Sequence, residues 1–201
     1  MLGSAGPCLI RDGDSLPLLG GMRFDSADVP TFVGNGLFDE IVMHEMGHVI
    51  GVGTLWRLKG LLVGAVRDGG TDPHFVGTLA IAAFDENGGA FYALGAKVPV
   101  ENIGGAGTAD GHWRESVFDT ELMTGFIDAG TNALSVITGA SMADLGYVLV
   151  NNAGAEPYSV ANPLSVRAEP GVQFALVDDI DRGPVLMIDA RGRVVRTMRI
   201  P

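Results

Sequence analysis

Two histidines and a glutamate stand close together in the segment His44-Glu45-Met46-Gly47-His48. In a helix, side chains four positions apart lie one above the other, so both imidazole rings can reach one metal ion. Glu45 lies between them on nearly the same face. The pattern H-E-x-x-H is typical of zinc hydrolases, in which the glutamate is the general base. The segment therefore predicts a hydrolytic zinc site, and the alternative is a buried helix with two incidental histidines.

The element that must position these residues is a helix, predicted over residues 36–50. At about 100° per residue, Ile41 falls in the same stripe as the histidines and the glutamate, while other apolar residues fall on the opposite side. Such a helix would form a buried wall of a cleft. The opposite side holds Met43, Met46 and Ile50. Asn35 is the expected N-cap, and Asp39 and Glu40 suit the positive end of the helix dipole. Gly51 fits the left-handed position that ends the helix.

A catalytic zinc ion needs a third protein ligand and an open position for water. Metzincin peptidases continue their motif as H-E-x-x-H-x-x-G-x-x-H. Gly51 stands in the glycine position here, but Thr54 stands where the third histidine would be. Glu115 and Glu121 are available as carboxylate ligands of the thermolysin type, although their sequence context does not match that type. His112 is the better candidate.

Several motifs follow one another in the order HEMGHVIG, GTADGHW, ELMTGF and LSVITGASMADLGY. In this order, and with a long insertion between the glycine of the first motif and the histidine of the second, the sequence resembles the leishmanolysin-like zinc metallopeptidases of bacterial type. These enzymes are metzincins. The resemblance covers residues 1–150 and rests on motifs for the active helix, the third ligand, the Met-turn and the helix that follows.

The resemblance implies a role for each site residue. It implies His44, His48 and His112 as the ligands of one catalytic Zn²⁺, Glu45 as the general base, and Met123 as the apolar floor beneath the metal. It also implies protein or peptide substrates and a secreted or cell-surface location.

The expected fold is α+β and metzincin-like, with the active-site helix between a small N-terminal sheet and a helical C-terminal part. Three regions are predicted: a catalytic domain over residues 1–150, a linker over 151–171 and a β-hairpin appendage over 172–201. Metzincin domains begin with a strand, a helix and a strand, whereas this sequence starts at the edge strand, so we expect a domain shortened at its N-terminus. An extended substrate is expected to pair antiparallel to residues 8–11 of that edge strand.

Other elements follow from local patterns. Strands are predicted over 5–11, 20–25 and 98–101, and a hairpin turn over 190–192. Helices are predicted over 55–62, 76–86 and 133–145. The last of these helices is expected to be capped by Asn132 and ended by Gly146. His74 is expected to be a surface histidine.

Composition limits the possible partners. Of the 201 residues, 47% are hydrophobic and 18% are charged, which predicts a folded core. A net charge of −11 disfavours nucleic acid and anionic membranes as partners. The single cysteine, Cys8, excludes an intrachain disulfide, and there is neither a transmembrane segment nor a signal peptide in this sequence.

The predicted function is zinc-dependent endopeptidase activity. Water activated by the metal would attack the peptide bond, with Glu45 as general base. Two alternatives stay open: a truncated, non-catalytic domain that binds zinc or a partner, and a surface adhesion module. The sequence leaves the oligomeric state open.

Overall fold

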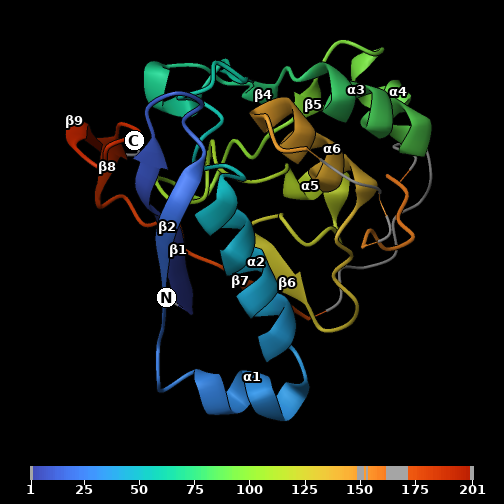
Figure 1. Ribbon diagram of the computed structural model, residues 1–201. Coiled ribbons are helices and arrows are strands. Elements are labelled where there is room, and N and C mark those ends of the chain that lie inside the picture. The colour runs from blue at the N-terminus through green and yellow to red at the C-terminus, as the bar shows by residue number, and fades with distance from the viewer. Residues whose placement is uncertain (1, 149–151, 153, 162–171, 200–201) are drawn as a thin grey trace.

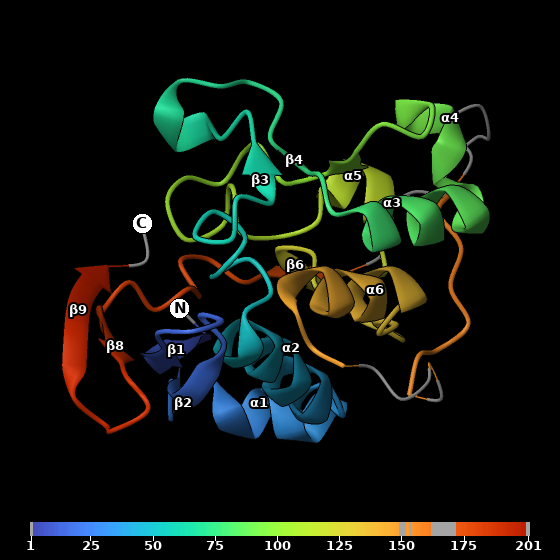
Figure 2. The same ribbon diagram turned by 45° about the horizontal axis from the view of Figure 1, so that its top comes forward.

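The computed structural model describes residues 2–148, 152, 154–161 and 172–199. It has the mixed α+β architecture expected from the sequence. Figures 1 and 2 show helix α2 at the centre, with a sheet on one side and helix α6 on the other. None of the helices in the described part of the chain is long and apolar enough to cross a membrane.

The N-terminal sheet has four strands in the order β2-β1-β8-β9. Strands β1 and β2 form an antiparallel hairpin, β8 runs parallel to β1, and β9 returns antiparallel to β8. The expected turn at 190–192 is confirmed, because Asp189 N donates to Arg193 O across it. The strands are β1 Gly3–Arg11, β2 Pro17–Phe24, β8 Pro184–Ile188 and β9 Val194–Arg199.

Strand β1 is not a free edge in this sheet. Its residues Leu9, Ile10 and Arg11 pair with Leu186, Met187 and Ile188 of β8. A strand from the C-terminal part lies beside residues 9–11 in this structure, so a substrate could pair there only after that strand has moved, and the expected pairing stays a prediction.

Residues 29–50 form two helices where one was predicted. Helix α1 spans Val29–Asn35 and helix α2 spans Phe38–Ile50. The sequence suggested a loop before α2 because of Pro30, but a proline in the first turn of a helix loses no hydrogen bond. Asn35 is the last residue of α1 rather than the N-cap of α2, and Leu37 begins α2 without a side-chain cap.

The C-terminal end of α2 is as predicted. Gly51 has a φ of 118° and its N–H donates to the carbonyls of Gly47 and His48. The next predicted helix, over 55–62, is wrong: residues 51–60 form consecutive turns. Gly53 and Gly60 both have a φ of 70° and interrupt a regular helix there.

The middle of the chain forms a small sheet and a kinked helical region. The helix expected over 76–86 is α3, which passes through a distorted segment at Gly88, with a φ of 99°, into α4. The elements are β3 Leu62–Val63, η1 Val66–Asp68, β4 His74–Phe75, α3 Thr78–Phe84, η2 Asp85–Gly89, α4 Ala90–Ala93 and β5 Val98–Pro99.

The last helix of the core, α6, is capped by a residue other than the predicted one. It spans Val136–Leu145, and Ser135 Oγ accepts a hydrogen bond from Thr138 N. Asn132 instead closes a turn, because its Oδ1 accepts from Asp128 N. Gly146 ends the helix as predicted, with a φ of 110°. The neighbouring elements are α5 Glu115–Phe118, β6 Phe126–Asp128 and β7 Gln173–Ala175.

The C-terminal segment 172–199 contributes to two sheets. Strand β7 pairs antiparallel with β6, and β8 pairs with β1. The division into a domain over 1–150 and an appendage over 172–201 stays a prediction, and these pairings connect the two parts. Most of the predicted linker, 151–171, lies outside the described residues.

The main core lies beside the active helix and is rich in aromatic rings. Trp56 and Trp113 are both fully buried, with ring centroids 4.6 Å apart, and Phe75 packs edge-on against both. Trp113 Nε1 donates to Thr138 Oγ1 of α6 at 2.7 Å. Because Trp113 directly follows His112, this core fixes the position of the third predicted ligand.

One glycine brings the turn after α2 against the loop that carries His112. A Cβ at Gly53 would lie 1.9 Å from the carbonyl oxygen of Gly111. Only a residue without a side chain permits this approach of two backbones.

We predict that Gly53→Ala lowers the free energy of unfolding by at least about 2 kcal/mol more than Gly60→Ala. Both glycines have a φ of 70°, but a Cβ at Gly60 would meet nothing within 4 Å. Gly60→Ala therefore measures the cost of a side chain at this φ alone, without a steric clash. Chemical denaturation of the two variants measures the difference. Equal destabilisation would show that the contact with Gly111 is unimportant.

Candidate metal centre

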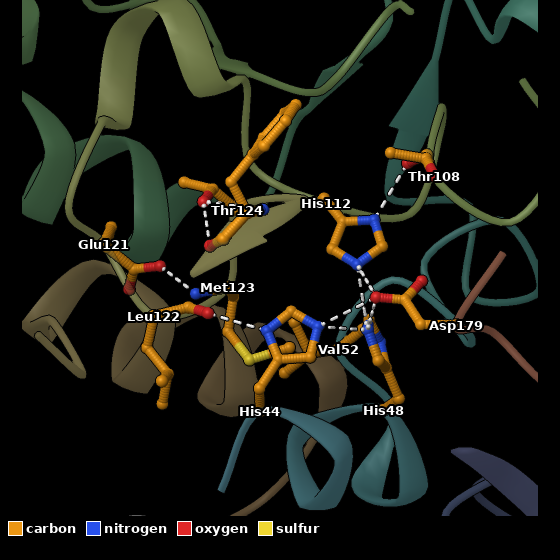
Figure 3. Close-up of polar contacts among 11 residues, drawn as sticks. His44, His48, Val52, Thr108, His112, Glu121, Leu122, Met123, Thr124 and Asp179 are labelled. Atoms are coloured by element: carbon orange, nitrogen blue, oxygen red, sulfur yellow. Dashed lines mark hydrogen bonds and ion pairs between the residues drawn. The ribbon is translucent and has the colours of Figure 1, made fainter. Parts of the chain in front are cut away.

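Three histidine rings meet at one point in the interior. The Nε2 atom of His48 lies 2.9 Å from that of His44 and 3.0 Å from that of His112. All three residues are fully buried. Figure 3 shows His44 and His48 rising from α2 while His112 reaches them from a separate loop. The structure thus brings together the three histidines that the sequence singled out.

The other nitrogen of each ring is held by a backbone carbonyl. Nδ1 of His44 contacts Leu122 O at 2.7 Å, Nδ1 of His48 contacts Val52 O at 3.0 Å, and Nδ1 of His112 contacts Thr108 O at 2.9 Å. A carbonyl only accepts, so each Nδ1 carries the proton. Each Nε2 is then left with a lone pair directed at the other two, the arrangement typical of metal-binding histidines.

The electrostatic setting keeps His48 neutral. Burial, together with the neighbouring rings of His44 and His112, lowers the pKa of His48 well below its ordinary value. A neutral imidazole is the form that binds a metal ion.

A fourth side chain, which the sequence analysis missed, joins the three rings. The Oδ2 atom of Asp179 lies 3.2 Å from His44 Nε2, 3.1 Å from His112 Nε2 and 3.9 Å from His48 Nε2. Its side chain is 1% exposed. Asp179 belongs to the acidic run Asp178-Asp179-Ile180-Asp181. Nothing in the sequence marks one of these aspartates as a metal ligand, because a run of acids normally lies at the surface.

The four donor atoms together fit a small, tetrahedral cation. The contacts of His48 Nε2 and Asp179 Oδ2 with the other donors range from 2.9 to 3.9 Å, and all four donor atoms lie within 4.8 Å of one another. A tetrahedral zinc site with bonds of about 2.0–2.1 Å has edges of about 3.3 Å. Lone pairs of buried nitrogens this close repel each other unless a cation lies between them. The donor set therefore matches zinc in chemistry and in size.

Glu45 lies beside this cluster and is fully buried. Among the residues that the structure describes, neither of its carboxylate oxygens has a hydrogen-bond partner. Burial, and secondarily the Asp179 carboxylate, raises the pKa of Glu45 to about 9. A Cβ at Gly3 of β1 would lie 2.5 Å from Glu45 Oε1, so the carboxylate sits directly against the strand.

The predicted Met-turn residue lies against the active helix. Met123 is 1% exposed, and a Cβ at Gly47 of α2 would lie 2.6 Å from its Sδ. The turn is stabilised by Glu121, whose Oε2 accepts from Met123 N at 2.6 Å and whose Oε1 accepts from Ser135 Oγ at 2.7 Å. Glu121 therefore accepts hydrogen bonds that stabilise the turn, and it is not one of the side chains that meet at the three histidine rings.

The remaining candidates lie away from the rings. Thr54 Oγ1 donates to His48 O at 2.8 Å and so supports the end of α2. His74 is in strand β4, where its Nδ1 contacts Asp72 O at 2.8 Å. Glu115 belongs to a second acidic group with Asp119 and Asp128. None of these residues is placed to bind the same ion.

The second acidic group gives a prediction about pH. Burial raises the pKa of Glu115 to about 7, and the nearby carboxylates of Asp128 and Asp119 add to the shift. Because this pKa is above the ordinary value of 4.5, ionisation of Glu115 costs stability, and the cost grows as the pH rises from 4.5 through 7. Glu115→Gln in the metal-free chain should therefore gain on the order of 1–3 kcal/mol relative to wild type above pH 7 and little at pH 4.

Denaturant unfolding at several pH values measures this difference. Glu86→Gln, at an exposed position, is the control and should show no such trend. A stability difference between Glu115→Gln and wild type that does not change with pH would contradict the prediction.

The metal site gives a second prediction. We expect one Zn²⁺ per chain, and His112→Ala should weaken its binding by at least about 100-fold, because one of the converging donors is lost. His74→Ala removes a histidine outside the cluster and should leave the affinity unchanged. Competition with a chromophoric chelator measures both. Equal losses in the two variants would mean that the ion binds elsewhere.

Comparison with known proteins agrees with these motifs. The sequence profile of the leishmanolysin family matches residues 2–184. The leishmanolysin-like peptidase of Drosophila pseudoobscura pseudoobscura is 36% identical over 96 residues, which are 48% of this chain and 13% of that protein. The chain therefore spans a small part of the length of this relative. The profile match covers far more than half of the chain, and the protein belongs to the leishmanolysin family of peptidases.

Proposed function

We propose that the protein is a zinc-dependent endopeptidase. The observation that carries the proposal is that His48 Nε2 lies 2.9 Å from His44 Nε2 and 3.0 Å from His112 Nε2. The buried carboxylate of Glu45 lies beside them, with no hydrogen-bond partner among the described residues. His44, His48 and His112 would hold the ion, and Glu45 would be the catalytic residue. Family membership supports this reading, because the matched relative is named a peptidase.

The chemistry divides between the metal and the protein. When bound, zinc supplies a Lewis acid that lowers the pKa of water and polarises the scissile carbonyl. Glu45 takes the proton of the attacking water and later gives it to the leaving amine. In the metal-free chain the raised pKa of Glu45 favours the neutral acid, and a divalent cation held by the three histidines would favour the carboxylate that this transfer needs.

The surrounding residues keep this arrangement in place. The carbonyls of Leu122, Val52 and Thr108 fix the tautomer of the three rings, so that no rotation is needed before the ion binds. Met123 fills the space beneath the helix at Gly47. We propose this methionine as the Met-turn of a metzincin arrangement.

Substrates would be proteins or peptides, and we propose a secreted or cell-surface location from the family alone. The net charge of −11 makes nucleic acid an unfavourable partner. The alternative is a module that binds a surface or stores zinc. Such a module would not hydrolyse peptide bonds, whereas the enzyme would.

The test is cleavage of casein by the purified chain loaded with zinc. We expect hydrolysis that a chelator abolishes and added zinc restores. Glu45→Ala should keep the zinc but lose at least about 100-fold in rate, because the general base is absent. Asp39→Asn, which removes an acidic residue from an exposed position of the same helix, is the control and should retain the rate.

Two outcomes would contradict the proposal. Full activity of a zinc-loaded Glu45→Ala variant would show that another group is the base. A chain that holds zinc yet cleaves no substrate, even after replacement of Asp179, would favour the adhesive or zinc-storing alternative.

A further inference from the structure

A short C-terminal segment lies along the strand that borders the metal centre. We call residues 177–183 the cover segment. Ala5 N donates to Asp179 O at 2.7 Å, and Asp181 N donates to Ala5 O at 2.8 Å. Ala5 and Ile180 form a parallel bridge, and the chain then continues into β8 beside Leu9–Arg11. The backbone groups of Ala5 and of Leu9–Arg11 on this side of β1 are therefore already engaged.

The cover segment fits closely against its surroundings. A Cβ at Gly111 would lie 2.2 Å from Ile180 Cδ1, and a Cβ at Gly107 would lie 2.3 Å from Asp178 Oδ1. Ile180 is 7% exposed. The loop that carries His112 thus has glycines where the cover segment passes, so the two are shaped to pack together.

Ion pairs hold the two sides of this segment. Arg23 of β2 contacts Asp181 Oδ2 at 2.7 Å. Arg182 pairs with Asp178 within the segment, and the side chain of Asp178 is 46% exposed. Of the three aspartates in the segment, only Asp179 enters the metal centre.

Asp179 occupies the position that a catalytic zinc site leaves open. Its Oδ2 is a fourth donor atom beside the three Nε2 atoms, and its Oδ1 has no hydrogen-bond partner among the described residues. A buried carboxylate costs several kcal/mol unless a positive charge compensates it. A divalent cation held by the three rings would supply that positive charge.

We propose that Asp179 is a fourth, displaceable ligand of the zinc ion and that the cover segment keeps the active site closed until it is moved away. The proposal rests on the zinc peptidase function proposed above. The cover segment runs parallel to β1, whereas a substrate was expected to run antiparallel to it. A substrate would compete with the cover segment for the backbone groups of β1 and with Asp179 for the metal.

Cobalt(II) in place of zinc, with acetohydroxamate as the probe, tests the coordination. The hydroxamate can bind only at a coordination position of the metal that no protein ligand occupies. We therefore expect the cobalt absorption spectrum of Asp179→Asn to change at a hydroxamate concentration at least about ten-fold lower than that needed for wild type. Asp178→Asn makes the same change one residue away and should behave as wild type. Equal hydroxamate affinity in wild type and Asp179→Asn would overturn the proposal.

A measurement on the wild-type chain covers the case in which Asp179→Asn does not fold. Hydrogen exchange of the zinc-loaded protein is compared with and without a saturating peptide hydroxamate. Protection of the Asp181 amide should fall when the inhibitor displaces the cover segment. Unchanged protection with the inhibitor bound at the metal would overturn the proposal.

Casein cleavage by the same variants separates the two proposals. We expect Asp179→Asn to cleave at least about ten-fold faster than wild type, with Glu45→Ala in that background inactive. If the hydroxamate results hold but no variant cleaves casein, the ligand assignment stands and the peptidase function fails. If wild type and Asp179→Asn cleave equally and bind hydroxamate equally, the function stands and the cover segment has no role.

Discussion

The structure depends on placing three imidazole nitrogens at one buried point. Nitrogens 2.9–3.0 Å apart would repel each other in a dry interior unless a cation joins them. Each ring is aimed there by a hydrogen bond from its Nδ1 to a backbone carbonyl, and these carbonyls come from three different segments. The positions of the turn at Leu122, of the turn after α2 and of the loop before His112 are thus tied to a single centre. Binding of the ion would stabilise all three together.

Glycines make this convergence sterically possible. Gly47 admits Met123 beneath the helix, and Gly53 admits the backbone of the loop at Gly111. Gly3 leaves room for the carboxylate of Glu45. At each point a methyl group would fall within 2.6 Å of an atom of a catalytic or supporting segment. The high glycine content, 30 residues of 201, is in part a requirement of bringing separate backbones to one small site.

Local patterns in the sequence predicted what depends on local spacing. The helix was predicted from the four-residue spacing of His44 and His48, and its end from a glycine, Gly51, that can adopt a left-handed backbone conformation. The structure has both the helix and this end. His112 was found from the order of motifs, and the structure brings its ring to the other two. Helix α1 was missed because Pro30 suggests a break unless its position in the first turn is known. Asp179 was missed because its role comes entirely from a long-range pairing with β1, which no local pattern encodes.

The pairing of β1 with β8 also sets the order in which the molecule can be completed. The two strands lie at opposite ends of the chain, with Leu9 beside Leu186. Contacts of such sequence separation form late, because a long loop must close first. During synthesis from the N-terminus, β1, β2 and α2 emerge and can associate while the cover segment is still being made. Until residue 179 has been added, the nascent protein has its three histidines but lacks the carboxylate of Asp179 that contacts them. Under the two proposals above, the length of sequence between His112 and Asp179 sets how long a growing chain has its histidines but lacks the residue that closes the site.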